Sequence, residues 1–211
     1  MPLPQRKGSN KMKITRKTTE SVISVSLTPP PLAADYRRKI DTPITFLNHM
    51  IEHIAWRSGV NVETSFEADQ FVLGHLICED TGITMGRAIS RYLEECGGVG
   101  YGDGIGIIDE AMAVAAVSFE GRAYFDMASD VKIPERAEDM ASEDLKVFLD
   151  GLAQGAPMTL HVNVKKGENS HHIWEAVFRA VGIALSRAFA ADPARPEFTA
   201  GVAGKINFIE E

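Results

Sequence analysis

Two stretches of the chain alternate apolar and polar residues along their length. They are SVISVSL, which begins at Ser21, and AMAVAAVSF, which begins at Ala111. Successive side chains of a strand point to opposite faces of a sheet, so this alternation predicts strands with one buried face. Two further runs, VNVETSFE from Val60 and MTLHVNVKK from Met158, also have the composition of strands.

The chain contains an internal repeat with a helical period. HLICEDTGITMGRAISR, beginning at His75, aligns without a gap with HHIWEAVFRAVGIALSR, beginning at His171, and seven positions are identical. Apolar residues recur in these stretches every three or four positions, as one face of a helix requires. Upstream, FLNHMIEHI from Phe46 matches DLKVFLDGL from Asp144 with a two-residue shift. The order helix, strand, longer helix therefore occurs twice.

This tandem duplication predicts an α+β fold of two similar units. Each unit is a sheet with helices on one face, and a pseudo-twofold axis relates the two. We place the first half at residues 13–98 and the second at residues 99–211 of one compact domain. The glycine-rich residues 96–106 are interpreted as a loop at the seam. Residues 1–12 are basic but lack an apolar run, so we interpret them as a flexible leader and not as a secretory signal.

The composition is that of a globular protein, and it excludes several classes of function. Hydrophobic residues make up 45% of the 211 positions, and the formal net charge is −7. An acidic chain without a basic footprint argues against a nucleic-acid partner, and no apolar run approaches the length of a membrane span. Cys78 and Cys96 fall in one predicted helix, too far apart for a disulfide. We therefore expect a cytoplasmic protein with neither a nucleic-acid nor a membrane partner.

Histidine and glutamate recur at matched positions of the repeat. His171 and Glu175 are four residues apart and share one face of their helix, whereas His172 points about a quarter-turn away. The first half repeats the pair as His75 and Glu79. Imidazole nitrogens and carboxylate oxygens suit Zn²⁺, Mn²⁺ or Fe²⁺. One helix start can thus present ligands to two metal ions.

The repeat says less about the other histidines. His49 corresponds to Val147, and the second histidine of the doublet corresponds to Leu76. An idealised half therefore carries three histidines and one glutamate, and each half lacks a different member. His53 is interpreted as an ordinary surface residue. For His161, on a predicted strand, a hydrogen-bonded or core role and a functional role both stay open.

These residues lie in stretches that resemble the imidazoleglycerol-phosphate dehydratase family. The stretches are RKTTESVISVSL, TPITFLNHMIEHIA, HLICEDTGITMGRAI, IIDEAMAVAAVSFEGRAYF and MTLHVNVKKGENSHHIWEAVFRAVGIAL. Together they reach from about residue 16 to residue 190, and GENSHHIWEA and EDTGI are specific to the family. The resemblance implies a duplicated α+β fold and a large homo-oligomer, a cage of about 24 subunits with active sites between subunits.

The resemblance also implies two manganese sites, each with two histidines and one carboxylate of this chain. The ligands are His49, His171 and Glu175 for one site, and His75, Glu79 and His172 for the other. The fourth ligands are expected where Leu76 and Val147 stand. Because three protein ligands can still hold a metal ion, we expect weak or partly filled Mn²⁺ sites, with Zn²⁺ or Fe²⁺ as alternatives.

Further residues are assigned by the resemblance to a small phosphorylated substrate. The basic groups expected to bind it are Arg57, Arg122, Arg179 and Lys205. The expected catalytic carboxylates are Glu20, Glu79 and Glu175. The implied reaction is that of a hydro-lyase of histidine biosynthesis, which dehydrates imidazole glycerol phosphate to imidazole acetol phosphate.

Several positions depart from the family pattern, among them Arg179, where a lysine is usual, and the C-terminal VAGKINF, where a serine-rich loop is usual. Hydrocarbon stands at Leu76 and Val147, Arg57 replaces a usual histidine, and Gly100 replaces a usual arginine. Two alternatives therefore stay open: a related metal-dependent lyase with another phosphorylated substrate, and a non-catalytic relative that keeps the assembly. Turnover of imidazole glycerol phosphate separates the dehydratase from both, and bound metal separates the lyases from the non-catalytic protein.

Overall fold

The computed structural model describes residues 11–68, 70, 72–192, 194, 200–202 and 204. The elements of the first half are β1 (Met12–Lys17), β2 (Ser21–Thr28), the 3₁₀ helix η1 (Tyr36–Lys39), α1 (Thr45–Ser58), β3 (Asn61–Ala68) and α2 (Gly74–Cys96). Those of the second are β4 (Tyr101–Ile108), β5 (Ala111–Ser118), β6 (Tyr124–Ser129), β7 (Arg136–Ala137), β8 (Met140–Ala141), α3 (Ser142–Gly155), β9 (Thr159–Lys166) and α4 (Ser170–Ala188). Most of the expected leader, residues 1–10, lies outside the described residues, and Met12 already begins β1.

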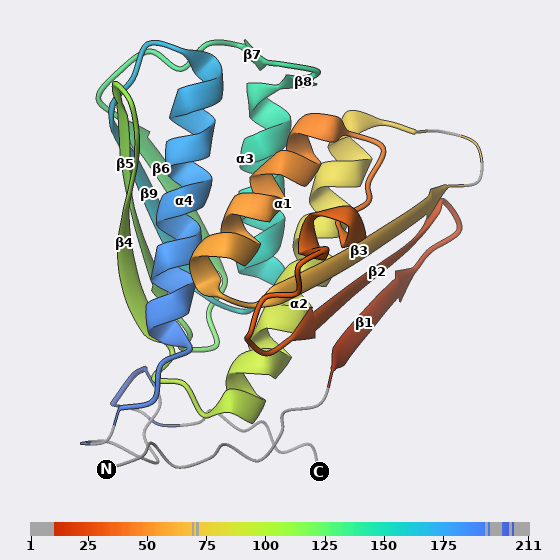
Figure 1. The fold of residues 1–211 in the computed structure, drawn as a ribbon, viewed down its shortest axis with the longest axis vertical. Helices are drawn as coiled ribbons and strands as arrows, with labels where there is room; N and C mark the ends of the chain where they lie inside the picture. The colour runs from red at the N-terminus through yellow and green to blue at the C-terminus, as the bar shows by residue number, and fades with distance from the viewer. Residues whose placement is uncertain are drawn as a thin grey trace.

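The four α-helices lie between two sheets (Figure 1). β1, β2 and β3 form an antiparallel sheet in that order. The second sheet has the order β4, β5, β9, β6, in which β6 runs parallel to β9. α2 packs on β1 and β2, α4 packs on β4 and β5, and the two halves meet where α2 packs on α3 and α1 on α4. The prediction of an α+β fold with helices on one face of each sheet is confirmed.

The order of elements shows the duplication directly. Helix, strand and longer helix occur as α1, β3, α2 and again as α3, β9, α4, and each set follows a β-hairpin. The first sheet also keeps a trace of a fourth strand, because Ile40 forms a single parallel bridge with Thr64 of β3. This bridge lies on β3 where the parallel strand β6 lies on β9. The predicted strands β2, β3, β5 and β9 and the four predicted helices are all present.

The seam between the halves differs from its prediction as a loop. Residues 101–106 form most of strand β4, and only the residues just before it connect α2 to the strand. A Cβ added at Gly102, Gly104 or Gly106 would lie 2.0–2.3 Å from carbonyl oxygens of α4. The alternate glycines therefore form the face on which α4 packs directly against the strand backbone. These glycines occur at every second position, which is the period of a strand. The prediction of a loop considered only how many glycines the segment contains and not their spacing.

Large apolar side chains fill the space between the helices. Phe148 of α3 and Phe178 of α4 are fully buried, with ring centroids 5.7 Å apart. Trp174 is also buried, and its indole Nε1 donates to Ser142 Oγ over 2.9 Å, so its polar atom is satisfied.

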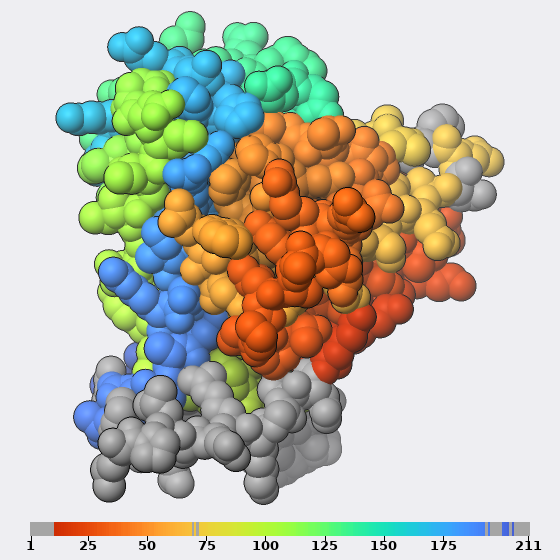
Figure 2. Space-filling model, in the orientation of Figure 1, coloured from red at the N-terminus to blue at the C-terminus, as the bar shows by residue number. Residues whose placement is uncertain are grey.

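Figure 2 shows α1 and α4 side by side at the surface of one face of the molecule. Among the described residues, no helix has the length and hydropathy needed to cross a membrane.

Candidate metal centre

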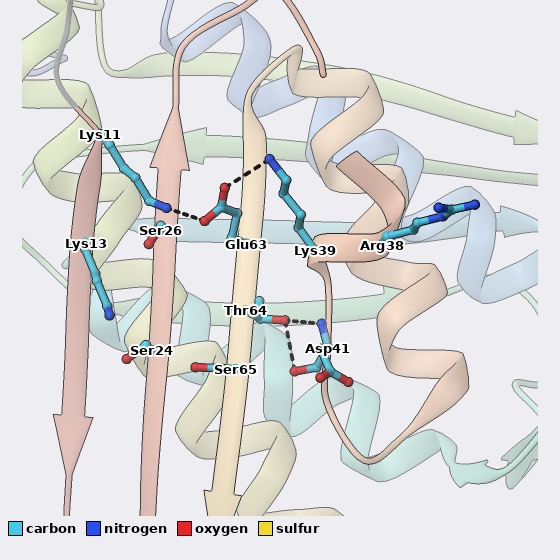
Figure 3. A pocket seen from close by; sticks show the side chains of 10 residues that line it. All are labelled: Lys11, Lys13, Ser24, Ser26, Arg38, Lys39, Asp41, Glu63, Thr64 and Ser65. Atoms are coloured by element: carbon cyan, nitrogen blue, oxygen red, sulfur yellow. Dashed lines mark hydrogen bonds and ion pairs between the residues drawn. The ribbon is translucent and has the colours of Figure 1, made fainter. Parts of the chain in front are cut away.

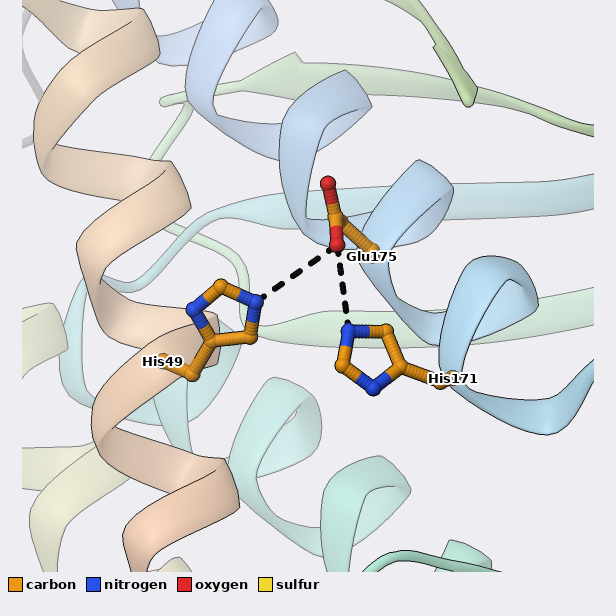
Figure 4. Close-up of side chains that lie close together, drawn as sticks. All are labelled: His49, His171 and Glu175. Atoms are coloured by element: carbon orange, nitrogen blue, oxygen red, sulfur yellow. Dashed lines mark ion pairs between the residues drawn. The ribbon is translucent and has the colours of Figure 1, made fainter. Parts of the chain in front are cut away.

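The candidate site lies where α1 and α4 cross. Gly182 of α4 makes the close approach possible, since a Cβ there would lie 2.8 Å from the Cβ of Arg57 and 3.0 Å from the carbonyl oxygen of His53. With the two backbones so close, side chains on the facing surfaces two or three turns away can meet. His49 projects from α1 into this region, and His171 and Glu175 project from α4 (Figure 4).

These three side chains converge on one point. One ligand atom of each lies within 4.8 Å of the other two. Nε2 of His171 is 3.2 Å from Oε2 of Glu175, and Nε2 of His49 is 3.5 Å from the same oxygen. The side chain of Glu175 is only 5% exposed, whereas the two histidines are about a third exposed and face a pocket. Among the described residues this is the one group of three His, Cys, Asp or Glu side chains with that geometry.

A second carboxylate orients each of the two histidines. Nδ1 of His49 is 3.3 Å from Oε2 of Glu52, and Nδ1 of His171 is 3.0 Å from Oε1 of Glu138. A carboxylate accepts hydrogen bonds, so each Nδ1–H donates outward and each Nε2 keeps a lone pair. Both lone pairs then point at an anionic oxygen of Glu175. A cation between them removes this repulsion, and carboxylate-oriented histidine is the usual arrangement around a metal ion.

The other oxygen of Glu175 has different partners. Arg179 donates from Nη2 to Oε1, and Nε2 of His53 lies 3.4 Å from Oε1. Burial raises the pKa of the Glu175 carboxyl, but its basic neighbours, of which Arg179 is always cationic, lower it by more, so the carboxylate is ionised at neutral pH. Burial also lowers the pKa of His53 to about 4. Oε2 is thus the oxygen left for a metal ion.

The donor set therefore fits a divalent metal ion. Two imidazole nitrogens and one carboxylate oxygen are a common three-ligand set for Zn²⁺ and are compatible with Mn²⁺ and Fe²⁺. All three side chains come from helices, which hold them more firmly than a loop does. α1 and α4 are also tied at their N-terminal ends by one turn of the chain. Its Asp139 accepts hydrogen bonds from the backbone N–H groups of Thr45 and Phe46 over 3.0 and 3.1 Å, while the adjacent Glu138 holds His171.

His53 lies beside this group, and its interpretation as an ordinary surface residue is wrong. Its side chain is only 13% exposed, and its Nε2 is 3.3 Å from Nε2 of His49. The two residues are four apart on α1, the same spacing as His171 and Glu175 on α4. That spacing was the available signal, but the repeat counterpart of His53 is Gly151, and the repeat guided the interpretation.

The other expected metal ligands do not gather within one chain. Nδ1 of His172 is 2.8 Å from Oε2 of Glu110. His75 is exposed on α2, with Nδ1 4.0 Å from Asp144 of α3, and Glu79 is exposed one turn later. In the described part of the chain, His75, Glu79 and His172 form no common group with close ligand atoms. Their shared site stays a prediction.

The expected substrate-binding residues are placed as follows. Arg57 is exposed two turns after His49 on α1, and Arg122 is exposed with Nη2 2.7 Å from Glu120. Arg179 binds Glu175 and also donates to the carbonyl oxygen of Ile107 over 2.8 Å. Lys205 lies outside the described residues. Glu20 is exposed in the turn between β1 and β2, where its backbone N–H donates to Thr18 Oγ1.

Two surface hollows are relevant to ligand binding. One opens directly on the histidines and is lined by Arg37, Thr45, Phe46, Asn48, His49, Glu52, Glu138, Asp139 and His171. The other crosses the first sheet (Figure 3), where Lys11 and Lys39 both pair with Glu63. The second hollow has no histidine or group of metal ligands, so the first is the better candidate for a reacting substrate.

Comparison with known proteins gives a consistent family assignment. The family model described as imidazoleglycerol-phosphate dehydratase matches residues 42–185. The imidazoleglycerol-phosphate dehydratase of Endomicrobium trichonymphae is 34% identical over 179 residues, covering 84% of this chain and 89% of that protein. That of Metallosphaera sedula is 36% identical over 174 residues, covering 82% and 88%.

Solved structures agree with these sequence matches. The crystal structure of IGPD from Pyrococcus furiosus in complex with (S)-C348 superposes with a TM-score of 0.77 at 31% identity, covering 92% of this chain and all of that one. The imidazoleglycerol-phosphate dehydratase of Staphylococcus aureus subsp. aureus N315 gives a TM-score of 0.69 at 27% identity, covering 84% and 98%. Sequence and fold lead to the same assignment, and the chain belongs to the imidazoleglycerol-phosphate dehydratase family.

Proposed function

We propose that this protein is a metal-dependent hydro-lyase that dehydrates imidazole glycerol phosphate to imidazole acetol phosphate in histidine biosynthesis. The observation that carries the proposal is the convergence of His49, His171 and Glu175 in a chain whose relatives bear the name of that enzyme. The substrate class follows from the names of the relatives. The metal follows from the donor atoms.

Mn²⁺ is the metal we propose, held by His49, His171 and Glu175, with Zn²⁺ or Fe²⁺ as alternatives. When bound, it would act as a Lewis acid that holds the imidazole ring of the substrate and stabilises negative charge on it. Glu52 and Glu138 keep the two histidines in the tautomer that offers Nε2. Arg179 keeps Glu175 ionised and leaves its Oε2 free. In this proposal Arg179 therefore acts on the metal ligand Glu175 and does not bind the substrate.

The remaining residues are proposed to bind and protonate the substrate from the pocket side and from neighbouring subunits. Arg57, Arg122 and Lys205 are proposed for its phosphate, because a small phosphate ester needs cationic partners. Glu20 and Glu79, both exposed carboxylates, are proposed to move protons. Neither lies at the His49 cluster in one chain, so their action requires a second subunit.

A second metal site is proposed from His75, Glu79 and His172, completed between subunits of a large homo-oligomer. What supports it is that His75 and Glu79 are exposed on α2 and that the three side chains form no common group with close ligand atoms within the described part of one chain. Glu110 accepts from Nδ1 of His172, which leaves Nε2 free for a ligand beyond the chain. Because the proposed site needs residues of two subunits, its ligands do not converge within one chain.

A non-catalytic relative is the second candidate. The observation that favours it is the ion pair of Arg179 with Glu175, which already supplies a cation to the carboxylate. Hydrocarbon at Leu76 and Val147 also leaves both sites short of one ligand each. The third candidate is a related lyase with another phosphorylated substrate. It would bind metal as the dehydratase does, but it would not turn over imidazole glycerol phosphate.

The test is an assay of imidazole glycerol phosphate turnover by the purified full chain with added Mn²⁺, beside elemental analysis. We expect turnover that a chelator abolishes. His171→Ala should lower kcat/KM by more than about 100-fold, because it removes a ligand and not merely a group that orients one. His161→Ala, on the outer face of the second sheet, is the matched control and should be unaffected. Metal binding without turnover would favour the related lyase, and failure to bind metal would favour the non-catalytic relative.

A further inference from the structure

We propose that Asp80, a buried carboxylate without a role in the proposed mechanism, is a positioning residue for Glu20. The proposal rests on the proposed function, in which Glu20 moves a proton. Asp80 lies on α2 directly after Glu79, and its side chain is only 7% exposed. Glu20 lies in the turn between β1 and β2, on the sheet against which α2 packs.

One oxygen of Asp80 ties the hairpin of β1 and β2 to α2. Its Oδ2 accepts from Nη1 of Arg16 over 2.6 Å and from Oγ of Ser21 over 3.0 Å. Arg16 lies near the end of β1, and Ser21 is the first residue of β2. A single carboxylate of the helix therefore holds the turn that carries Glu20 by both of its strands.

Thr18 fixes the turn from within. Its Oγ1 accepts from the backbone N–H of Glu20 over 3.1 Å and from that of Ser21 over 3.0 Å. The side chain of Glu20 is nevertheless exposed, and in the described part of the chain its carboxylate has no hydrogen-bond or ion-pair partner. The backbone of Glu20 is thus held in place while its carboxylate stays available to a group outside the chain.

The second half of the duplication has small residues where the first half has this ion pair. Each hairpin turn ends in a glutamate directly before its second strand, Glu20 before β2 and Glu110 before β5. With the hairpins aligned on these glutamates and the helices on the repeat, Arg16, Ser21 and Asp80 correspond to Gly106, Ala111 and Ala176. A Cβ added at Gly106 would lie 2.0 Å from the carbonyl oxygen of Ala176, so there the helix packs directly on the strand. Packing of a helix on this hairpin therefore does not require an ion pair.

The two turn glutamates also differ in how they are held. The carboxylate of Glu110 accepts from the backbone N–H of Asn169 and from the ring of His172, so its own side chain is fixed. Glu20 has no such partners, and the contacts of Asp80 fix its backbone instead. A buried ion pair is often no more stabilising than apolar residues of similar size, because both charges must leave water. Placement of an unpaired carboxylate accounts for the ion pair where stability does not.

A double-mutant cycle with the full chain and added Mn²⁺ separates positioning from general structural support. We expect Ser21→Ala to lower kcat about 10- to 100-fold with KM little changed, because a small misplacement of a catalytic group has an effect of that size. In a Glu20→Gln background, Ser21→Ala should lower kcat no further, since it acts only through the Glu20 carboxylate. Ser24→Ala is the matched control on the same strand. It removes a hydrogen bond to Thr15 and should leave kcat unchanged.

The outcomes of the cycle are distinct. If Ser21→Ala lowers kcat equally in the wild type and in the Glu20→Gln background, or not at all in the wild type, the proposal is overturned. A wild type without turnover defeats the proposed function and this proposal with it. Turnover by the wild type with additive effects of the two substitutions defeats this proposal alone.

Hydrogen exchange tests the same contacts without reference to activity. In Asp80→Asn, which removes the charge and keeps the shape, we expect the backbone amides of Glu20 and Ser21 to exchange faster than in the wild type. The amides of β5, in the other sheet, should exchange as before. Unchanged exchange of both turn amides in a folded Asp80→Asn protein overturns the proposal. If Asp80→Asn does not fold, Ser21→Ala is measured in the same way, with the same expected and contrary results.

Discussion

At the start of α4, two neighbouring histidines are each held by a glutamate from a tight turn. Glu138, in the turn between β7 and β8, accepts from Nδ1 of His171, and Glu110, in the turn between β4 and β5, accepts from Nδ1 of His172. Each glutamate fixes which ring nitrogen is free, and so which way each histidine can bind a ligand. Two single residues thereby fix the free ring nitrogen of each histidine, as the two proposed metal sites require.

Glu110 gives a pH dependence that can be measured. Backbone N–H donation from Asn169, followed by His172, lowers the pKa of Glu110 to about 2. A carboxyl whose pKa is lower in the folded than in the unfolded chain stabilises the fold above its unfolded pKa, near 4.5, and loses that contribution as the pH falls toward 2. We expect Glu110→Gln to lower the melting temperature at pH 6–7, and the gap to the wild type to narrow between about pH 4.5 and pH 2.

Thermal melts across this pH range in a metal-free buffer check the prediction. A gap that stays constant down to pH 2 would mean that the hydrogen bonds to Glu110 do not persist in solution.

Single residues also mark where sequence reasoning reached its limit. His49, His171 and Glu175 were predicted together because the repeat and the family pattern place them, and the structure brings them to one point. His53 was missed because its repeat counterpart is not a histidine, and its burial depends on how α4 crosses α1. Burial of a polar residue on a helix surface is decided by its neighbours in space, which one sequence does not contain.

At the scale of elements, the crossing of α1 and α4 decides whether the ligands meet. We expect Gly182→Ala to weaken both the fold and metal binding, since the added Cβ would lie 2.8 Å from the Cβ of Arg57 and must push the helices apart. Overpacking of this kind typically costs about 1–3 kcal/mol. The shift would carry His49 away from Glu175, so metal affinity should fall as well.

The duplication supplies the matched control for this prediction. Gly86 is the repeat counterpart of Gly182, and its Cβ would lie 2.2 Å from the carbonyl oxygen of Leu152 where α2 crosses α3. Gly86→Ala should destabilise the fold at least as much, yet leave the affinity of the His49 site nearly unchanged. Chemical denaturation and Zn²⁺ titration of both variants check this, and an equal loss of affinity in both would show that the crossing does not position the ligands.

Elements with a clear period were predictable, and elements defined by packing were not. The alternation in β2 and β5 and the helical period of α4 follow directly from residue order. β4 was hidden because its inward face consists of glycines, and the bridge of Ile40 with Thr64 has no local signal at all. From sequence alone, a glycine-rich segment is interpreted as a loop. Its role in a strand becomes clear only when the helix that packs against its backbone is known.

At the scale of the whole molecule, the two sheets belong to the two halves of the duplication but have different outer faces. On the second sheet, Ile105 and Ile107 of β4 are 56% and 62% exposed. The outer face of the first sheet carries Lys13 and Ser24 instead. Exposed apolar strand faces of this kind usually bind another protein surface. We therefore expect the second sheet to contribute to the homo-oligomer that the proposed function requires.

Light scattering checks this expectation. The wild type should form a large homo-oligomer, and Ile107→Lys should shift it toward smaller species without loss of secondary structure. Lys13→Glu, on the outer face of the first sheet, should leave the size unchanged. A monomeric wild type that still turned over substrate would contradict both the assembly and the shared second site.

The turn of Glu138 and Asp139 has a consequence for how metal binding can be observed. Asp139 accepts from the amides of Thr45 and Phe46, and Glu138 accepts from the ring of His171. A metal ion that fixes His171 therefore also fixes Glu138, its neighbour Asp139 and the first amides of α1. The hydrogen-exchange rates of Thr45 and Phe46 should fall as the site fills, so two backbone amides that touch no ligand can report its occupancy.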